Sequence, residues 1–428
     1  MEASGIVFIH GGGAGSMIGE SMWKQLIREH GISVEGIKDD SIMFDCPGVA
    51  FQEIDKGLYR PRSLFIDPDA QDVTRIRKGM LKKLWSPDTN FVTSNKDTGN
   101  LYTEGYYTTY YSVNEGITEK IRRLVEPIDQ LEGFLISRSV SGGTGSGLMK
   151  RVMTDLMRDF TKRPIAEVCL FPSTRYSDMP IEPYNAMFGI DTTDNSNCYS
   201  MLLSNEGVGE YIANAFSKPY CTMSEINSVI ARLMCNVTCQ ARMSGERVLE
   251  KLIKTAAYSC RAFNIAMPSY SVLCHEDNNK LIECKLDLTR QIFQDYTQLL
   301  GYPLSKSVGN YLNYQGNTSE LEAHGILTSS GSFDISKLST NTSINAIEKW
   351  VPTRVFEDSS APYCELAHVS VNVGVCQALK DLAKKYDKLM STRAYIHWIV
   401  GCGISSECVG VEREEVQSFI QDISEVLE

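Results

Sequence analysis

A glycine-rich segment, VSGGTGSGL at residues 140–148, follows the apolar run GFLISR and precedes a helical pattern. Four of its residues are glycine and three are serine or threonine, so its side chains add little to a hydrophobic core. Glycines between a strand and a helix let the backbone approach a ligand closely. Amides that begin a helix lack intrahelical acceptors and attract anions. The segment therefore predicts a loop that binds a diphosphate or triphosphate, and a ligand-free tight turn is the alternative.

Other classes of glycine-rich loop fit the sequence less well. A hydrolase nucleophile elbow needs glycines two residues on either side of the serine, but Thr144 and Leu148 flank Ser146. A P-loop ends in GK[ST], which does not occur here. The earlier turn GGGAGSMIG at 11–19 could open a dinucleotide-binding fold, which expects an acidic residue about 20 positions later. Asp67 lies far beyond that distance, so a dehydrogenase is disfavoured.

Short apolar runs alternate with helical patterns over roughly the first 210 residues, as expected for βα units. The predicted strands are GIVFIH (5–10), PRSLFIDPDA (61–70), GFLISRSV (133–140), IAEVCLFP (165–172) and CYSMLLSNEG (198–207). This alternation predicts an α/β fold in which helices cover both faces of a parallel sheet. Ligands in such folds bind beyond the carboxyl ends of the strands. The segments expected there are Gly11–Gly15, Asp67, Asp69, Thr98–Asn100 and Ser141–Gly147.

One helix is predicted directly after the glycine-rich segment, and three longer ones are predicted in the second half of the chain. Leu148, Val152, Leu156 and Phe160 recur at four-residue spacing and indicate one apolar helix face. Longer helices are predicted at 224–243, 374–400 and 412–428, with mixed strands and loops between about 244 and 370.

Composition restricts the class of partner. The chain has 42 basic and 53 acidic residues, a formal charge of -11, which disfavours non-specific binding to nucleic acid or to an anionic membrane. It has no apolar run of the roughly 18 residues that a membrane helix needs and no pattern of a secretory signal. The 13 cysteines include no CxxC pair, which favours buried thiols in a reducing cytosol.

The sequence GGTGSG after a strand resembles the tubulin signature, and the resemblance extends along nearly the whole chain. The segments that carry it are MWKQLIREHGISVEGI (22–37), DQLEGFLISRSVSGGTGSGL (129–148), EPYNAMF (182–188) and KKYDKLMSTRAYIHWI (384–399). The first, second and fourth are most similar to γ-tubulin. The resemblance implies a three-part architecture: a GTP-binding domain at 1–210, an α+β intermediate domain at 211–370 that includes the long central helix, and a C-terminal helical region at 371–428.

The resemblance also implies a function. A γ-tubulin-like GTP-binding protein would template microtubule nucleation at a microtubule-organising centre or spindle pole in the cytoplasmic cytoskeleton. Its partners would be γ-tubulin complex proteins, α/β-tubulin and lateral copies of itself, and it would be at most a weak GTPase. Two alternatives stay open. One is an α/β-tubulin-like GTPase subunit of a dynamic filament. The other is a tubulin-fold protein that only binds partners and whose nucleotide site has degenerated.

The tubulin resemblance assigns a nucleotide site residue by residue. Asp69 would lie near a possible Mg²⁺ and bind it through water. Asp178, Glu182 and Asn205 would contact the ribose and base, and Asn227 would read the guanine. The full set is Gly12, Gly13, Ala14, Asp69, Gly99, Asn100, Ser141, Gly142, Gly143, Thr144, Gly145, Ser146, Asp178, Glu182, Asn205, Met223 and Asn227.

Three positions depart from the family pattern. Gly13 and Met17 stand where the family has glutamines, and Met223 replaces an aromatic residue that stacks on the base. A lost hydrogen bond costs about 0.5–1.5 kcal/mol and a lost aromatic stack about 1 kcal/mol, or roughly 2–4 kcal/mol together. We therefore expect nucleotide binding that is weakened and not abolished.

A fourth departure concerns hydrolysis. In α/β-tubulin an acidic residue from the neighbouring subunit activates water at the terminal phosphate. The matching stretch here is SGERVLEKLI (244–253), and Ile253 is expected at the position of the acid. Isoleucine cannot accept a proton, so this chain would not trigger hydrolysis in a partner, as expected of a nucleating template.

Overall fold

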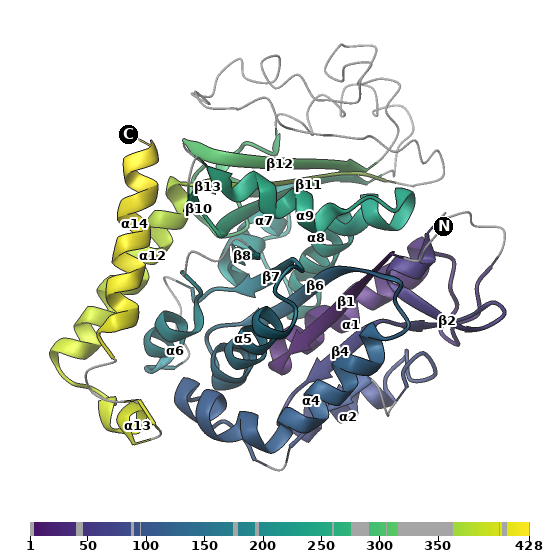
Figure 1. Ribbon diagram of the computed structural model, residues 1–428. Helices are drawn as coiled ribbons and strands as arrows, with labels where there is room; N and C mark the ends of the chain where they lie inside the picture. Colours follow the sequence, from purple (N-terminus) through teal and green to yellow (C-terminus); the bar gives the residue numbers. More distant parts are fainter. Residues whose placement is uncertain are drawn as a thin grey trace.

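Figure 1 shows the computed structural model of the chain, which describes most of its length. The described residues are 4–39, 46–86, 90–94, 96–173, 179–192, 197–258, 261–274, 291–304, 306–315, 363–401, 403–404 and 409–427. The strands are β1 (Ser4–Gly11), β2 (Phe51–Asp55), β3 (Leu58–Pro61), β4 (Ser63–Ile66), β5 (Phe91–Val92), β6 (Gln130–Ser139), β7 (Ile165–Leu170), β8 (Cys198–Leu203), β9 (Ala257–Tyr258), β10 (Arg261–Ala262), β11 (Ile265–Cys274), β12 (Ser307–Gln315) and β13 (Tyr363–Asn372).

The α-helices alternate with these strands over the first half of the chain. They are α1 (Gly12–Glu29), α2 (Ala70–Lys78), α4 (Tyr110–Val125), α5 (Met149–Asp159), α6 (Glu182–Gly189), α7 (Asn205–Ala215), α8 (Met223–Ser244), α9 (Val248–Ala256), α12 (Val373–Ser391), α13 (Ile396–Val400) and α14 (Val411–Leu427). Short 3₁₀ or π turns are η1 (Pro47–Val49), η2 (Glu104–Thr109), η3 (Thr144–Leu148) and η4 (Asp295–Thr297). Among the helices that the structure describes, none combines the length and the apolarity of a membrane span.

One nine-stranded sheet forms the centre of the fold, in the order β12-β13-β11-β8-β7-β6-β1-β4-β5. From β5 to β11 neighbouring strands are parallel, whereas β13 and β12 pair antiparallel at the other edge. The β8–β11 pairing consists of Ile265 opposite Ser200 and Ala266 opposite Met201. The predicted α/β fold with a parallel sheet is therefore confirmed.

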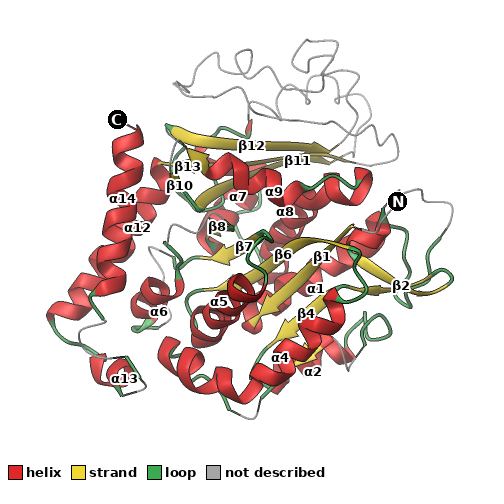
Figure 2. Cartoon of the chain, in the orientation of Figure 1, coloured by secondary structure: helices red, strands yellow, loops and turns green. Residues whose placement is uncertain are grey.

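Side chains of β1 show why the sheet is covered on both faces. Successive strand residues point to opposite faces. Ile6 and Phe8 enter one hydrophobic core with side chains of α1 and α8. Val7 and Ile9 enter a second core with side chains of α4 and α5. All four side chains are fully buried, as expected of a strand between two helical layers, and Figure 2 shows these layers around the yellow strands.

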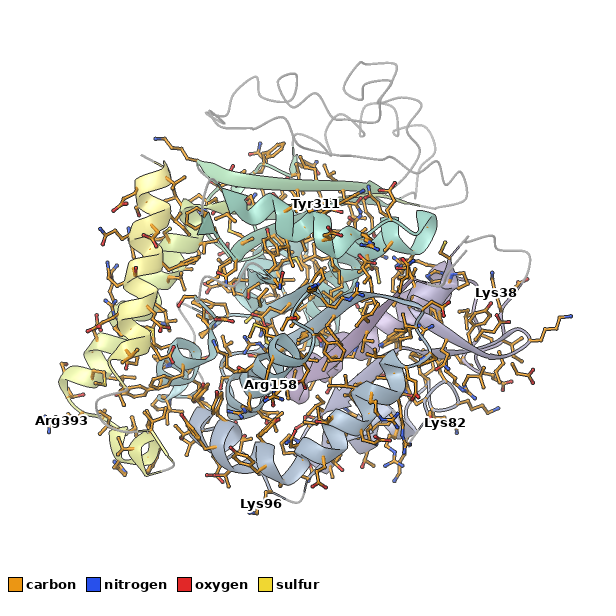
Figure 3. All side chains as sticks on the ribbon, viewed as in Figure 1. Lys38, Lys82, Lys96, Arg158, Tyr311 and Arg393 are labelled. Carbon is orange, nitrogen blue, oxygen red and sulfur yellow. The ribbon has the colours of Figure 1, made fainter. Side chains whose placement is uncertain are left out.

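The second half of the chain packs against the same sheet. Tyr311 of β12 lies inside the molecule in Figure 3, whereas Lys82, Lys96 and Arg393 point outward. Helices α12 and α14 lie side by side along one flank of the molecule (Figure 1).

The prediction of one helix at 374–400 is wrong, because α12 ends at Ser391 and α13 begins at Ile396. Arg393 and Tyr395 have φ of 51° and 60°, which a right-handed helix cannot contain. Tyr184 of α6 donates a hydrogen bond to the carbonyl oxygen of Ala394 at 2.9 Å. A contact with a distant helix therefore holds the break.

The remaining predicted elements occur with small shifts in their ends. Within the run at 61–70, Pro61 ends β3 and Ser63–Ile66 form β4, which stops before Asp69 because Asp69 caps α2. The predicted helix at 224–243 corresponds to α8. Its N-terminus has a capping box in which Thr222 and Glu225 satisfy each other's backbone amides. Helix α9 lies in the region for which only mixed strands and loops were expected.

Candidate functional site

Four parallel strands end at the same edge of the sheet, and each leads into part of the predicted site. Strand β1 leads into Gly12 at the start of α1, and β4 leads to Asp69, the N-cap of α2. Strand β6 leads into Ser141 of the glycine-rich loop, and β8 leads to Asn205, the first residue of α7. The parallel pairing makes this edge common to all four strands, and it is where α/β folds bind ligands.

The glycine-rich loop contacts both of the other predicted phosphate segments. A Cβ placed on Gly12 would lie 3.4 Å from Cβ of Thr144, so the first turn of α1 reaches this loop. The hydroxyls of Thr98 and Thr144 are 3.3 Å apart. A Cβ on Gly143 would lie 2.6 Å from the backbone nitrogen of Leu101, closer than real contacts allow. Glycine at 143 is therefore required by the close approach of two loops.

Carbonyl oxygens of the loop point into the protein. Gly142 O accepts hydrogen bonds from the amide and the hydroxyl of Ser146, at 3.0 and 2.7 Å. Gly145 O accepts one from Arg138 at 2.9 Å, and Ser141 O accepts one from Asn185 at 2.9 Å. The following turn, Thr144–Leu148, is a π turn, a feature often found at functional sites. With the carbonyls held inward, the first amides of the helix are left to face an anion.

Asn185 organises the site and was missed as a site residue from the sequence. Its side chain is almost fully buried in α6. Its Nδ2 donates to Asn100 O at 2.7 Å and to Ser141 O at 2.9 Å, while its Oδ1 accepts from Tyr102 N at 2.9 Å. One amide side chain thus fastens the Gly99–Asn100 loop to the glycine-rich loop. Only its place in the segment EPYNAMF, itself part of the resemblance, could have drawn attention to it.

The Gly99–Asn100 turn has an unusual backbone. Gly99 and Asn100 both have positive φ, 53° and 58°, a region that glycine and asparagine tolerate best. A Cβ on Gly142 would lie 3.7 Å from Oδ1 of Asn100. The turn therefore places the Asn100 side chain next to the glycine-rich loop.

Carboxylates gather at the end of β4. Asp67 is 4% exposed and accepts a hydrogen bond from the amide of Asp69 at 3.1 Å. Burial, together with the negative charges of Asp72, Asp69 and Asp97, raises the pKa of Asp67 to about 7. Asp69 itself caps α2 by accepting from the amide of Gln71 at 2.8 Å. Divalent cations such as Mg²⁺ prefer carboxylate oxygens, so a cation here would relieve the repulsion among these groups.

The predicted base and ribose contacts lie at the starts of three helices. Glu182 begins α6 and is mostly buried, Asn205 begins α7 and is exposed, and Met223 begins α8 and is 53% exposed. Asn227 is buried one helical turn beyond Met223, which places both on the same helix face. Among the described residues no hydrogen bond joins Asn205 or Asn227 to the glycine-rich loop. Asp178, the other predicted ribose or base contact, lies outside the described residues.

Ile253, which is expected at the position of the acid, lies on α9. Ile253 is partly buried and packs against the main hydrophobic core. On the outer side of α9, Glu250 pairs with Lys254 at 2.8 Å and with Arg247 at 3.6 Å. The expectation that Ile253 stands at the position of the acid, and that this chain would not trigger hydrolysis in a partner, therefore stays a prediction.

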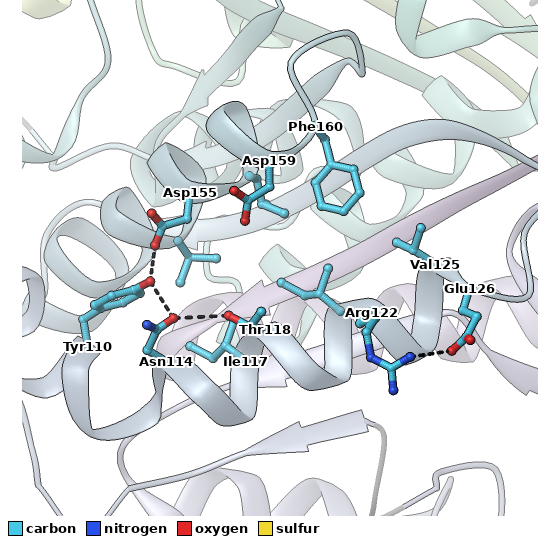
Figure 4. Close-up of a pocket in the computed structure, with 13 residues that line it drawn as sticks. Tyr110, Asn114, Ile117, Thr118, Arg122, Val125, Glu126, Asp155, Asp159 and Phe160 are labelled. Atoms are coloured by element: carbon cyan, nitrogen blue, oxygen red, sulfur yellow. Dashed lines mark hydrogen bonds and ion pairs between the residues drawn. The ribbon is translucent and has the colours of Figure 1, made fainter.

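A separate groove lies between α4 and α5, on the sheet face away from α1 and α8. Its volume is about 420 Å³, and Ile117, Ile121, Val152 and Leu156 supply much of its apolar lining. Its polar rim is paired internally, as Figure 4 shows. Asn114 accepts from the hydroxyls of Tyr110 and Thr118, and Arg122 pairs with Glu126. None of the predicted nucleotide-site residues lines this groove.

Comparisons with known proteins agree with this geometry. The Tubulin/FtsZ family, GTPase domain, matches residues 5–213, the stretch that contains β1 to β8. The chain is 27% identical to the tubulin alpha-A chain of Neurospora crassa, covering 98% of this chain and 96% of that protein. It is 26% identical to the tubulin alpha-1 chain of Schizosaccharomyces pombe, with 98% and 96% covered. It is 27% identical to the tubulin alpha chain of Encephalitozoon cuniculi, with 98% and 97% covered. Residues 5–213 thus match the GTPase domain of the Tubulin/FtsZ family, and the chain is homologous to α-tubulins along almost its whole length.

Proposed function

We propose that this protein binds GTP or GDP at the carboxyl edge of its parallel sheet and assembles with tubulin-type subunits. The observation that carries this proposal is the convergence of three loops. Gly12, Thr98 and Thr144 come from segments far apart in sequence and meet at one edge. Asn185 adds hydrogen bonds that hold two of these loops together. This arrangement suits a phosphate chain that is bound by backbone amides and hydroxyls.

The two ends of the nucleotide would be held by different elements. The phosphates would lie against the first turn of α1 and the loop Ser141–Ser146, with Gly99 and Asn100 near the terminal phosphate. The ribose and base would lie toward Asp178, Glu182, Asn205, Met223 and Asn227. Mg²⁺ would sit beside Asp69, where Asp67 and Asp72 supply further negative charge. When bound, it would neutralise part of the phosphate charge.

Assembly as a filament subunit is supported by the relatives, which are named as tubulin alpha chains and match 98% of this chain. In this role copies of the chain, or the chain with α/β-tubulin, would stack in the cytoskeleton of the cytoplasm. The division at residues 210 and 370 into GTP-binding, intermediate and C-terminal parts belongs to the same proposal.

A nucleating template of γ-tubulin type is the second candidate. It is favoured by the similarity of residues 22–37, 129–148 and 384–399 to γ-tubulin. In this role the partners would be γ-tubulin complex proteins and lateral copies of the chain, and the protein would reside at a microtubule-organising centre or spindle pole.

The nucleotide that purified protein releases on denaturation tests the binding proposal. We expect close to one GTP or GDP per chain, separated by anion-exchange chromatography. A protein that carries no nucleotide, and that fails to bind GTP with Mg²⁺ at millimolar concentration, would contradict the proposal. The chain would then be a partner-binding protein that keeps only the fold.

Assembly with α/β-tubulin separates the two roles. The purified protein is added to α/β-tubulin at a small molar fraction, and polymer mass is followed by turbidity and by pelleting. A filament subunit enters the pellet in proportion to its amount and does not shorten the lag. A template shortens the lag at substoichiometric amounts and stays at filament ends.

A further inference from the structure

Arg138 of β6 is a fully buried cation beside the glycine-rich loop. Its side chain is 0% exposed, and its Nε and Nη2 donate to the carboxylate of Glu167 at 2.5 and 3.1 Å. Ser200 of β8 donates to the same carboxylate at 2.5 Å. A buried charge is tolerated when it is paired and hydrogen-bonded. The ion pair thus satisfies one side of the guanidinium and fixes its plane.

The other side of the guanidinium reaches two segments of the candidate site. Nη1 donates to Gly145 O at 2.9 Å, inside the glycine-rich loop. Nη2 also donates to Gly189 O at 3.0 Å, at the last residue of α6. Helix α6 begins with Glu182, a predicted ribose or base contact, and carries Asn185. One side chain therefore connects the phosphate half of the site to the helix that carries part of the ribose half.

The contact at Gly145 fixes the direction of the loop amides. A trans peptide unit directs its carbonyl and its N–H in opposite directions. With Gly145 O held by Arg138, the N–H of Ser146 in the same peptide unit points the other way and donates to Gly142 O at 3.0 Å. This closes the first turn of the loop and leaves the amides of Gly143 and Thr144 at its open end.

We propose that Arg138 is a positioning residue for the phosphate chain, because it holds the glycine-rich loop and α6 at a fixed spacing through Gly145 O and Gly189 O. This inference rests on the proposed nucleotide binding. Arginine suits the role because its planar guanidinium can donate in several fixed directions at once. A lysine has one ammonium group and cannot reach Glu167, Gly145 and Gly189 together.

The chain offers a matched control for the test. Arg242 of α8 is also 0% exposed and pairs with Glu29 at 2.7 Å, and it donates to the carbonyl of Cys235 at 2.6 Å. It makes no hydrogen bond to the glycine-rich loop. Arg242→Lys therefore reproduces the loss of a buried guanidinium at a site remote from the loop.

The experiment measures the affinity of wild type, Arg138→Lys and Arg242→Lys for GTP, GDP and GMP by isothermal titration. For Arg138→Lys we expect GTP and GDP to bind about 10-fold more weakly, which corresponds to one or two lost hydrogen bonds. The affinity of Arg138→Lys for GMP, which carries a single phosphate, should change by less than about 3-fold. Arg242→Lys should leave the ratio of GTP affinity to GMP affinity unchanged. The inference would be overturned if Arg138→Lys lost affinity equally for all three nucleotides. It would also be overturned if Arg242→Lys lost affinity for GTP and GDP more than for GMP.

A second measurement uses wild-type protein and guards against a variant that does not fold. In nucleotide-free protein, native-state hydrogen exchange should show the amide of Ser146 protected as strongly as those of β6. Exchange at the rate of an open loop would contradict the anchoring by Arg138. Failure of wild type to bind any nucleotide would instead reject the proposed function, and the exchange result would still decide whether the loop is anchored.

Discussion

The carboxylate of Asp72 occupies the space that a side chain at residue 13 would need. A Cβ placed on Gly13 would lie 2.5 Å from Asp72 Oδ2. Asp72 is on the first turn of α2, where it also approaches Arg75 at 3.7 Å. The resemblance to tubulins implies that Gly13 stands where that family has a glutamine on the phosphate side. The glycine at residue 13 is therefore accompanied by the Asp72 carboxylate of α2, which extends into the space that a longer side chain at residue 13 would fill.

Restoring glutamine at residue 13 should depend on Asp72. We expect Gly13→Gln to lower the free energy of unfolding by about 1 kcal/mol, because Asp72 must move to admit the new side chain. In a background of Asp72→Ala the same substitution should cost little. Urea denaturation of wild type, both single variants and the double variant measures the coupling, which we expect near 1 kcal/mol. Strictly additive effects would show that the two residues do not compete for space.

Two glycines of the loop should differ strongly in how much an alanine substitution destabilises the fold. A Cβ on Gly145 would lie 2.0 Å from the carbonyl oxygen of Ser139, whereas a Cβ on Gly142 meets only Asn100 Oδ1 at 3.7 Å. Gly145→Ala should therefore destabilise the fold by about 3 kcal/mol or more, because backbone atoms must move. Gly142→Ala should change stability by less than about 0.5 kcal/mol.

The same pair separates folding from binding. Gly142→Ala adds a methyl group on the face where phosphates are proposed to lie, so we expect its GTP affinity to fall at unchanged melting temperature. Thermal unfolding and GTP titration of the two variants provide the measurement. A Gly142→Ala protein with full GTP affinity would place the phosphates away from this part of the loop.

Glu132 should make the stability of the protein depend on pH. It is 4% exposed on β6 and accepts a hydrogen bond from the amide of Leu249 at 2.8 Å. Burial raises the pKa of Glu132 from 4.5 to about 7. Between these two values the folded protein keeps a proton that the unfolded chain has lost. The stabilisation is thus complete below pH 4.5 and is lost as the pH rises to about 7.

Glu132→Gln removes this titration and keeps an acceptor for the amide of Leu249. The stability of the variant relative to wild type should therefore rise by on the order of 2–3 kcal/mol between pH 4.5 and pH 8. Denaturation at a series of pH values measures the difference, and Glu115→Gln on the exposed side of α4 controls for the loss of one charge. A constant difference between Glu132→Gln and wild type at all pH values would contradict the assignment.

Met223 should be a replaceable contact to the base. It is 53% exposed at the start of α8, so a larger ring can be accommodated without repacking the core. We expect Met223→Tyr to tighten GTP and GDP binding about 5-fold, equivalent to roughly 1 kcal/mol of aromatic stacking. Met223→Leu supplies the control for a change of shape without a ring. Identical affinities of the tyrosine and leucine variants would mean that the base does not stack at this position.

The sequence predicted the parallel sheet because its strands are continuous apolar runs bounded by glycine and acidic residues. Strands β1, β6 and β7 are buried on both faces, which produces that pattern. The break between α12 and α13 could not be predicted, since no glycine or proline marks residues 392–395. It is held by Tyr184, about 210 positions away in the chain.

The same division applies to the candidate site. The Ser141–Ser146 loop could be recognised because small residues in succession have a local meaning. The roles of Asn185 and Arg138 arise from contacts between segments that the fold brings together, and neither residue has a local signature. The raised pKa of Asp67 depends mainly on burial, which the fold creates and no local pattern encodes.

The pairing of β8 with β11 has a mechanical consequence. Only two residue pairs join these strands, whereas β7 is joined to each of its neighbours by six. A sheet resists bending through the ladder of hydrogen bonds between adjacent strands, so we expect least resistance at this seam, between the parallel strands up to β8 and the antiparallel strands β13 and β12. Strand β8 also leads directly to Asn205 at the candidate site. A nucleotide bound as proposed would therefore contact the residue that directly follows the β8 edge of this short seam.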